Sequence, residues 1–213
     1  MMAQSHIGYT SWDNPPANVM PAVLRGTEAL AAAPPAPAEA EAELVFAAPA
    51  VQFARAEGGG RFEWTRVPGL GSWGAAPLAL PQGLQPTGPD DGVYLEYPLR
   101  LREAGNYTVE LLLAPTLETI GSAGLRIGLS LDGGPVRELA VQLEPTNGEA
   151  NTPARAAWVN AVRENETSVS ARFDGVTRGE HRLRLYRIDD NVVPQALLVR
   201  RAPSASQGSA PPP

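Results

Sequence analysis

Residues Leu125–Leu143, LRIGLSLDGGPVRELAVQL, carry the clearest pattern of secondary structure in the chain. The first half of this stretch, Leu125–Leu131, places leucine or isoleucine at every second position. Successive side chains of a β-strand point to opposite faces, so this pattern is typical of a strand with one buried face. Asp132-Gly133 follows, and an Asp-Gly pair between two such runs indicates a tight hairpin. The stretch therefore predicts two antiparallel strands, Leu125–Leu131 and Val136–Leu143.

Similar short runs continue on both sides of this hairpin. Val93–Leu101 alternates over its full length, and 21 glycines and 22 prolines punctuate the chain with turns. We expect about nine short antiparallel strands and at most a short helical turn, at Asn160–Glu164. This pattern predicts an all-β fold, a β-sandwich or jelly roll. The expected strands are Leu44–Ala54, Arg61–Val67, Val93–Leu101, Tyr107–Leu113, Leu125–Leu131, Val136–Leu143, Ser168–Phe173, His181–Ile188 and Val192–Val199.

The chain of 213 residues divides into three parts by composition. Residues 1–42 predict an irregular segment that ends in an Ala/Pro linker, with Ala31–Pro37 as its stiffest part. Residues 43–202 hold all the strand patterns and predict one β-sandwich module. Residues 203–213, PSASQGSAPPP, have too little apolar surface to fold, so we expect a disordered tail.

Charge and composition argue against several classes of protein. The net charge of −6 speaks against nucleic acid, which needs a concentrated basic surface. No run of eighteen apolar residues is present, so we expect no membrane span. The absence of cysteine excludes disulfides and thiolate sites. All seventeen basic residues are arginine, and alanine is abundant, which favours a bacterial, GC-rich origin.

Catalytic motifs are missing from the sequence. The two histidines, His6 and His181, lie far apart, and no HExxH, phosphate-binding loop or GxSxG is found. His181 is interpreted as a structural residue at a strand start. Asp90-Asp91 and Asp189-Asp190 are interpreted as solvated turn acids, although a carboxylate pair or a calcium site remains an alternative. We therefore predict no catalytic residue, no metal and no cofactor.

Aromatic residues are the candidates for sugar binding, because an exposed ring can stack on the apolar face of a pyranose. Trp64 and Tyr97 lie on alternating apolar faces and are expected in the core. Trp73 and Tyr94 fall near a loop or on the opposite strand face, so they are the candidate carbohydrate-binding residues. Packing is the alternative role for both.

Six blocks in order resemble one known family. YTSWDNPPANVMPAV at Tyr9–Val23 resembles the segment before the C-terminal module of glycoside hydrolase family 115, the xylan α-1,2-glucuronidases. The other blocks resemble the module itself, and its motif residues fall at Trp64, Gly69, Gly71, Tyr97, Trp158, Asn165, His181 and Asp189. The blocks are WTRVPGLGSWGAAPLALP (64–81), LEYPLRL (95–101), LLLAPT (111–116), WVNAVRENET (158–167) and GEHRLRLYRIDDNVVPQALLV (179–199).

The resemblance implies a role in a larger enzyme. The family removes 4-O-methyl-glucuronic acid from xylan with carboxylates of upstream domains, and its C-terminal β-sandwich is accessory. The chain is thus expected to be non-catalytic and to pack on the catalytic domains or on the partner in a homodimer. Binding of xylan or glucuronoxylan is the alternative. Export to the periplasm or outside the cell is expected, through a signal of the parent.

Two residue-level expectations follow from the resemblance. Trp158 is expected to be a packing anchor rather than a sugar platform. Phe53-Ala54-Arg55 departs from the family, where an Ala-Glu pair is expected, and this departure weakens any carboxylate or calcium role there.

Overall fold

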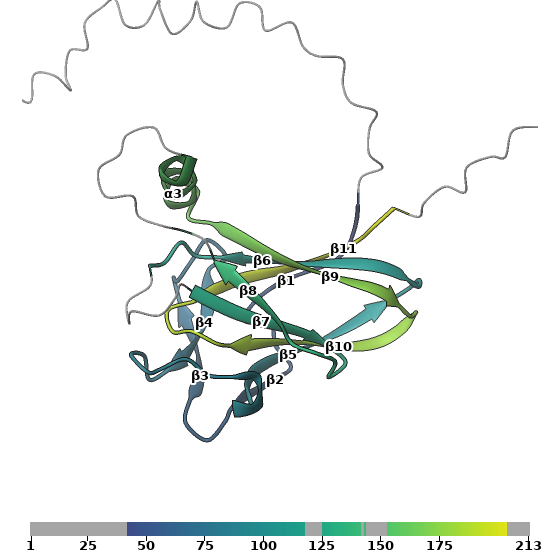
Figure 1. Cartoon of the computed structure of the whole chain (residues 1–213), viewed down its shortest axis with the longest axis horizontal. Coiled ribbons are helices and arrows are strands. Elements are labelled where there is room, and N and C mark those ends of the chain that lie inside the picture. The colour runs from purple at the N-terminus through teal and green to yellow at the C-terminus, as the bar shows by residue number, and fades with distance from the viewer. Residues whose placement is uncertain (1–41, 118–124, 142, 144–152, 204–213) are drawn as a thin grey trace, which may run out of the picture. The chain divides into compact units, whose positions relative to one another are not determined.

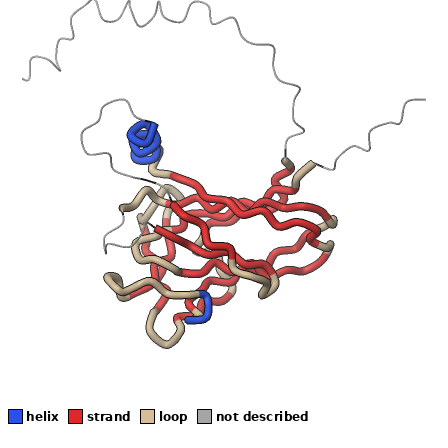
Figure 2. Tube along the Cα trace, viewed as in Figure 1, coloured by secondary structure: helices blue, strands red, loops and turns tan. Residues whose placement is uncertain are grey.

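A computed structural model describes residues 42–117, 125–141, 143 and 153–203. These residues form eleven strands, one α-helix and one 3-10 turn (Figures 1 and 2). The strands are β1 (Glu43–Pro49), β2 (Arg55–Gly58), β3 (Glu63–Pro68), β4 (Ala75–Leu80), β5 (Val93–Leu101), β6 (Gly105–Leu113), β7 (Leu125–Leu131), β8 (Arg137–Val141), β9 (Thr167–Val176), β10 (Gly179–Arg187) and β11 (Pro194–Arg201). The helix is α3 (Pro153–Glu164), and the 3-10 turn is η1 (Pro89–Asp91).

Two antiparallel sheets form the body of the module. One has four strands in the order β1-β11-β6-β9, and the other has five in the order β2-β5-β10-β7-β8. A separate hairpin, β3-β4, adds a small two-stranded sheet. The prediction of an all-β sandwich is confirmed.

The core lies between the inner faces of these two sheets. Alternate residues of β5 and β10, such as Leu95, Tyr97 and Leu185, are almost fully buried there and meet β6 and β11 residues of the other sheet. Each buried leucine contributes roughly 1.5–3 kcal/mol of transfer free energy. Tyr97 keeps its hydroxyl satisfied by donating a hydrogen bond to the Ala50 carbonyl at 2.6 Å. Burial raises the pKa of Tyr97, so this hydroxyl stays protonated.

The hairpin predicted over Leu125–Leu143 forms, although its second strand, β8, covers Arg137–Val141 instead of Val136–Leu143. β7 matches the expected Leu125–Leu131, and β8 pairs with it antiparallel, Leu129 opposite Arg137. Asp132 and Gly133 both have positive φ, 53° and 72°, and Gly134 N donates to Leu131 O at 2.9 Å, so a tight turn forms here. Residues 132–136 separate the two strands, so the connection is longer than the two-residue loop that the Asp-Gly pair suggested. The strand predicted at Val93–Leu101 also matches β5.

Three expectations about elements are corrected. The run Leu44–Ala54 is not one strand, because the chain crosses between sheets. Ala50 N donates to Gln195 O beside the four-stranded sheet, and Ala54 N donates to Glu96 O in the five-stranded sheet. β2 and β4 were not expected as separate strands, and α3 is a helix of 12 residues rather than a short turn.

The predicted segmentation is not tested by the structure. The irregular segment, its Ala31–Pro37 linker and almost all of the 203–213 tail lie outside the described residues, and these boundaries stay predictions.

Candidate functional site

The loop between β3 and β4 presents the predicted sugar-binding residue Trp73. Gly69 N donates to Gly74 O at 2.8 Å and closes this loop. The Trp73 side chain is 39% exposed, which is unusual for so large an apolar residue. Gly71 has φ +77°, and a Cβ there would fall 2.5 Å from Gln195 Oε1, so the loop depends on glycine at this position.

A buried amide anchors this loop. Gln195 is fully buried, and its Oε1 accepts a hydrogen bond from Ser72 N while its Nε2 donates to Asn165 O at 2.7 Å. Ser72 Oγ also donates to Asn165 O at 3.3 Å. The structure thus brings together the predicted motif residues Gly71 and Asn165. Sequence reasoning missed Gln195, although a lone amide inside the apolar run PQALLV is a signal for a buried polar link.

Asn165 also ends helix α3. It has φ +52°, its N–H donates to Val162 O, and the next N–H, of Glu166, donates to Ala161 O. This pair of bonds is a Schellman cap, which satisfies the last carbonyls of a helix. One residue therefore fixes the end of α3 and receives the loop that carries Trp73.

Helix α3 exposes much of its apolar surface. Only Ala161 is buried and Trp158 is half-buried among the side chains described, whereas Val159 and Val162 are 47% and 50% exposed. Figure 1 shows α3 beside the start of β9, standing clear of the two sheets. We call Val159, Val162 and Trp73 the helix–loop surface. The predicted role of Trp158 as a packing anchor stays a prediction.

Tyr94, the other predicted sugar-binding residue, lies on the outer face of the five-stranded sheet. Its ring centroid is 5.5 Å from that of Tyr186, and the Arg184 guanidinium sits 4.5 Å from the centroid of the Tyr94 ring. Arg184 Nε donates to Glu96 Oε2 at 2.8 Å, and this hydrogen bond raises the pKa of Arg184. A side chain of the same sheet thus already covers one face of Tyr94. The structure does not unite Trp73 and Tyr94 in one platform.

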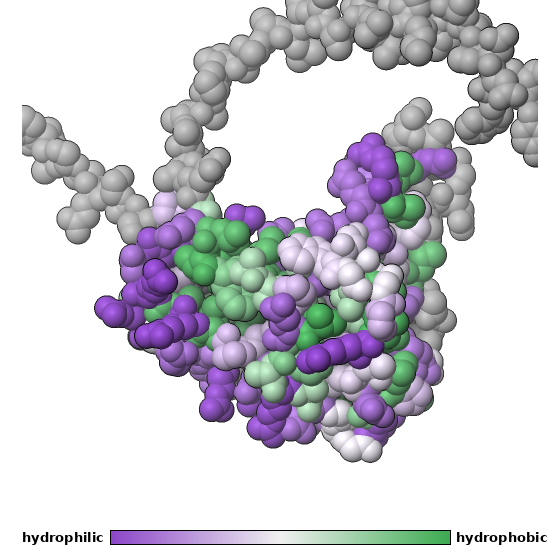
Figure 3. All heavy atoms as spheres, turned by 180° about the vertical axis from the view of Figure 1, so that it is seen from behind, coloured by the Kyte–Doolittle hydropathy of each residue, from purple (hydrophilic) through white to green (hydrophobic). Residues whose placement is uncertain are grey.

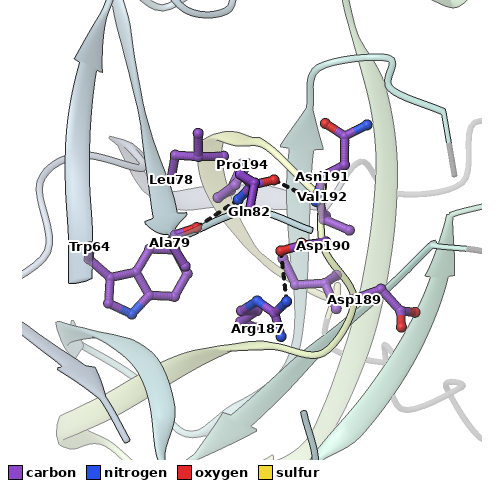
Figure 4. Close-up of a pocket in the computed structure, with 11 residues that line it drawn as sticks. Trp64, Leu78, Ala79, Gln82, Arg187, Asp189, Asp190, Asn191, Val192 and Pro194 are labelled. Carbon is purple, nitrogen blue, oxygen red and sulfur yellow. Dashed lines mark hydrogen bonds and ion pairs between the residues drawn. The ribbon is translucent and has the colours of Figure 1, made fainter. Parts of the chain in front are cut away.

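The carboxylates Asp189 and Asp190 are buried, which corrects their interpretation as solvated turn acids. Asp190 Oδ1 accepts from Arg187 Nη2 at 2.7 Å (Figure 4). Its Oδ2 accepts from the backbone N–H groups of Gly83 and Leu84. Asp189 accepts two bonds from Arg126, at 2.8 and 3.2 Å. The hydrogen bond to Asp189 raises the pKa of Arg126. Apart from Arg187, the groups that bind these two carboxylates come from distant segments, which local sequence context does not reveal.

The crevice beside this cluster is too small for a sugar. It is lined by the buried pair, by Trp64 and by Gln82, and its volume is about 10 Å³, roughly one water molecule. Trp64 is partly buried and donates through Nε1 to Glu57 O at 2.9 Å. The residues described hold no group of three or more His, Cys, Asp or Glu side chains that could bind a metal.

His181 is buried and joins two turns. Its Nδ1 lies 2.6 Å from Asp132 Oδ2, and its Nε2 lies 2.9 Å from Thr177 O. Both neighbours are acceptors, so both ring nitrogens donate only when the imidazole is protonated. Burial by itself lowers the pKa of His181, but the hydrogen bonds to Asp132 and Thr177 and the Asp132 charge raise it above its ordinary value.

Comparison with known families decides where this architecture belongs. The model of the glycosyl hydrolase family 115 C-terminal domain matches residues 40–213. The chain belongs to this family. No curated protein matches the sequence.

One solved structure shares this fold. A family GH115 4-O-methyl-alpha-glucuronidase, BtGH115A, with specificity for decorated arabinogalactans, matches with a TM-score of 0.54 and 18% identity over 80% of this chain. This match covers 19% of that enzyme, so the family 115 domain spans only a small part of its length.

Two carbohydrate-binding modules overlap more loosely. A family 35 module from Clostridium thermocellum has a TM-score of 0.47 and 14% identity, over 73% of this chain and 98% of the module. The C-terminal CBM6 of LamC, a marine laminarinase from Zobellia galactanivorans, has a TM-score of 0.46 and 19% identity over the same shares. No helix in the described part of the chain is long and apolar enough to cross a membrane.

Proposed function

We propose that this chain is a non-catalytic accessory module of a family 115-type enzyme, and that it docks on another domain of that enzyme through the helix–loop surface. The observation that carries the proposal is the exposure of Val159 and Val162 on α3. Membership in a C-terminal domain family supports the presence of further domains for such a contact.

The energetics of a short helix support a partner that covers α3. An isolated helix shorter than about 12–15 residues is marginal in water, and most helical stability in proteins comes from packing an apolar face. α3 has 12 residues and exposes two valines. Burying a valine side chain contributes roughly 1.5 kcal/mol or more, so a partner that covered this face would stabilise the helix.

The loop fits the same contact. Tryptophan is enriched at the centres of protein interfaces, because its large rigid ring buries much area at a low cost in entropy. The hydrogen bonds of Gln195 and Asn165 hold the Trp73 loop to the capped end of α3. Such a surface is already ordered before it meets a partner, which lowers the entropic cost of binding.

Sugar binding through Trp73 is the second candidate function. Its exposed indole on an anchored loop is available for stacking on a pyranose ring such as those of xylan. Tyr94 supports this candidate less, because Arg184 lies over its ring.

One pair of experiments tests the docking proposal. The upstream domains of a family 115 enzyme are produced separately, and their binding to the 213-residue chain is measured by sedimentation velocity and titration calorimetry. The change Val159→Asp with Val162→Asp is expected to weaken binding at least tenfold. Leu80→Asp, which alters an exposed leucine at the far end of β4, is the matched control and is expected to leave binding unchanged.

The outcomes separate the two candidates. Equal binding by the double variant and the wild type contradicts docking through α3. Retention on xylan affinity gels that Trp73→Ala abolishes, with no binding to the upstream domains, supports the sugar-binding candidate instead.

For the whole parent, we propose removal of 4-O-methyl-glucuronic acid from xylan and export from the cytoplasm of a bacterium.

A further inference from the structure

The end of the sandwich where β5 and β9 end carries two arginines without an ion-pair partner. Arg102 follows β5, and Arg178 precedes β10. β5 and β10 pair antiparallel, and their last paired residues at this end are Leu101 and Gly179. Arg102 and Arg178 are therefore the adjacent residues just beyond the pairing. The register thus brings two exposed guanidinium groups to the same strand ends. No ion pair to either is found within the residues described.

Like charges at adjacent strand ends repel each other, so this arrangement lowers the stability of the fold. Neighbouring arginines at the same end have acidic partners. Arg201 binds Glu43, at 2.8 Å, and Glu103, while Arg100 lies 3.3 Å from Glu180. The residues that line the two grooves at this end therefore carry four arginines against three glutamates, in a chain whose net charge is −6.

The two grooves meet at Arg100 and Arg102, which line both. One groove, of about 600 Å³, also contains Arg178, Gly179 and Glu180. The other, of about 350 Å³, has an apolar wall of Leu44 and Val45 beside Tyr107 and Arg201. Leu44 and Val45 are exposed, and Figure 3 shows an apolar area beside hydrophilic side chains on the rear face.

We propose that this end of the module binds an acidic polysaccharide, with a uronate carboxylate placed between Arg102 and Arg178. A guanidinium group binds a carboxylate with two parallel hydrogen bonds, and an anion between two arginines also removes their repulsion. The apolar wall of Leu44 and Val45 can pack against the C–H face of another sugar ring of the same polysaccharide. The nearby glutamates accept hydrogen bonds from sugar hydroxyls.

This site differs from the helix–loop surface and does not depend on the docking proposal. It uses other residues, and its ligand is a polysaccharide rather than a protein domain. A failure of docking through α3 leaves this proposal standing, and the reverse also holds.

Titration calorimetry with the full chain tests the proposal. The probes are an aldotetraouronic acid, which is a xylo-oligosaccharide that carries glucuronic acid, and neutral xylotetraose. We expect the acidic oligosaccharide to bind at least tenfold more tightly than the neutral one, and its affinity to fall as salt is raised. Inorganic sulfate and a sulfated oligosaccharide are the comparison anions, and both are expected to bind more weakly.

The variants locate the site. The double change Arg102→Gln with Arg178→Gln is expected to weaken binding of the acidic probe at least tenfold. Arg163→Gln removes an exposed arginine of α3 and, as a control, is expected to have no effect. Thermal unfolding checks that the double variant is folded. The NMR chemical-shift changes of Tyr107 and Leu44 on addition of the acidic probe give a second readout.

Four results would overturn the proposal. These are equal affinity for the neutral and acidic probes, full binding by the folded double variant, equal affinity for the sulfated oligosaccharide, and no binding of the acidic probe at millimolar concentration.

Discussion

Strand β10 begins next to Arg178 and ends at Arg187, and these two arginines lie in opposite environments. The Arg187 side chain is 4% exposed and binds Asp190, Thr87 Oγ1 and backbone carbonyls. Arg178 is exposed in the turn between β9 and β10 and has no ion pair in the part of the chain described. The same residue type thus stabilises the fold at the Arg187 end of the strand, whereas at the Arg178 end it is available to bind a ligand.

The largest expected effect comes from breaking the buried pair. Asp190→Ala leaves the Arg187 charge buried and removes the acceptor of two backbone N–H groups. Removing one partner of a buried ion pair costs about 3–5 kcal/mol, so the free energy of unfolding in urea should fall by this amount. Asp174→Ala, which removes an exposed partner of Arg172, is the control and should cost less than about 1 kcal/mol. Equal losses for the two variants would contradict the difference between buried and exposed pairs.

The anchored loop gives the next effect. Gly71→Ala places a methyl group against the buried Gln195 amide and forces an L-residue into φ +77°. Together these effects should destabilise the module by about 2 kcal/mol, measured by urea unfolding. Trp73→Ala alters the exposed side chain of the same loop and should leave stability nearly unchanged. A loss from Trp73→Ala as large as that from Gly71→Ala would show that the ring, not the backbone, holds the loop.

The His181 contact predicts a pH dependence. Because the folded state raises the pKa of His181, its contribution to stability is fully present below the ordinary pKa of about 6.5. This contribution is lost as the pH rises through the raised value, since the neutral ring can donate to only one of its two acceptors. Urea unfolding at pH 5.5, 7 and 8.5 measures the effect. His181→Gln should flatten the profile over this range, and an unchanged profile would exclude His181 as its source.

The smallest expected change in stability is at Arg178, next to the start of β10. Arg178→Gln removes one of two like charges and no ion pair in the described structure, so stability should stay within about 0.5 kcal/mol of the wild type or rise slightly. The gain should shrink at high salt, because salt already screens this repulsion. A loss above about 1 kcal/mol would show that Arg178 serves the fold, as Arg187 does.

The sequence predicted the strands whose alternation of apolar residues and flanking turn residues are both visible locally. Val93–Leu101 and Leu125–Leu131 matched their strands because their alternation and their turn residues agree. β4 was missed because its sequence, AAPLAL, has no β-branched residue and contains a proline. The run Leu44–Ala54 was read as one strand because its apolar residues continue while the chain changes sheets.

The candidate surfaces depended on long-range contacts, so the sequence revealed less of them. The burial of Asp189 and Asp190 depends on Arg126 and on the 83–84 backbone, which lie more than 60 residues away. The opposition of Arg102 and Arg178 follows from the pairing of β5 with β10, which no local pattern reports. Trp73 was singled out for its place near a loop, and its exposure agrees with that reasoning, while its function stays a prediction.

The pairing of β1 with β11 bears on how the module responds to force. Glu43 lies opposite Arg201 at one end of two antiparallel neighbours, so the chain enters and leaves the β-sandwich side by side. A pull applied between these two residues loads the β1–β11 hydrogen bonds one after another, as in opening a zipper, instead of shearing them all together. The edge strand β1 would then peel away at low force while the rest of the sandwich stays folded. The peptide segments before Glu43 and after Arg201 therefore join the β-sandwich at neighbouring points.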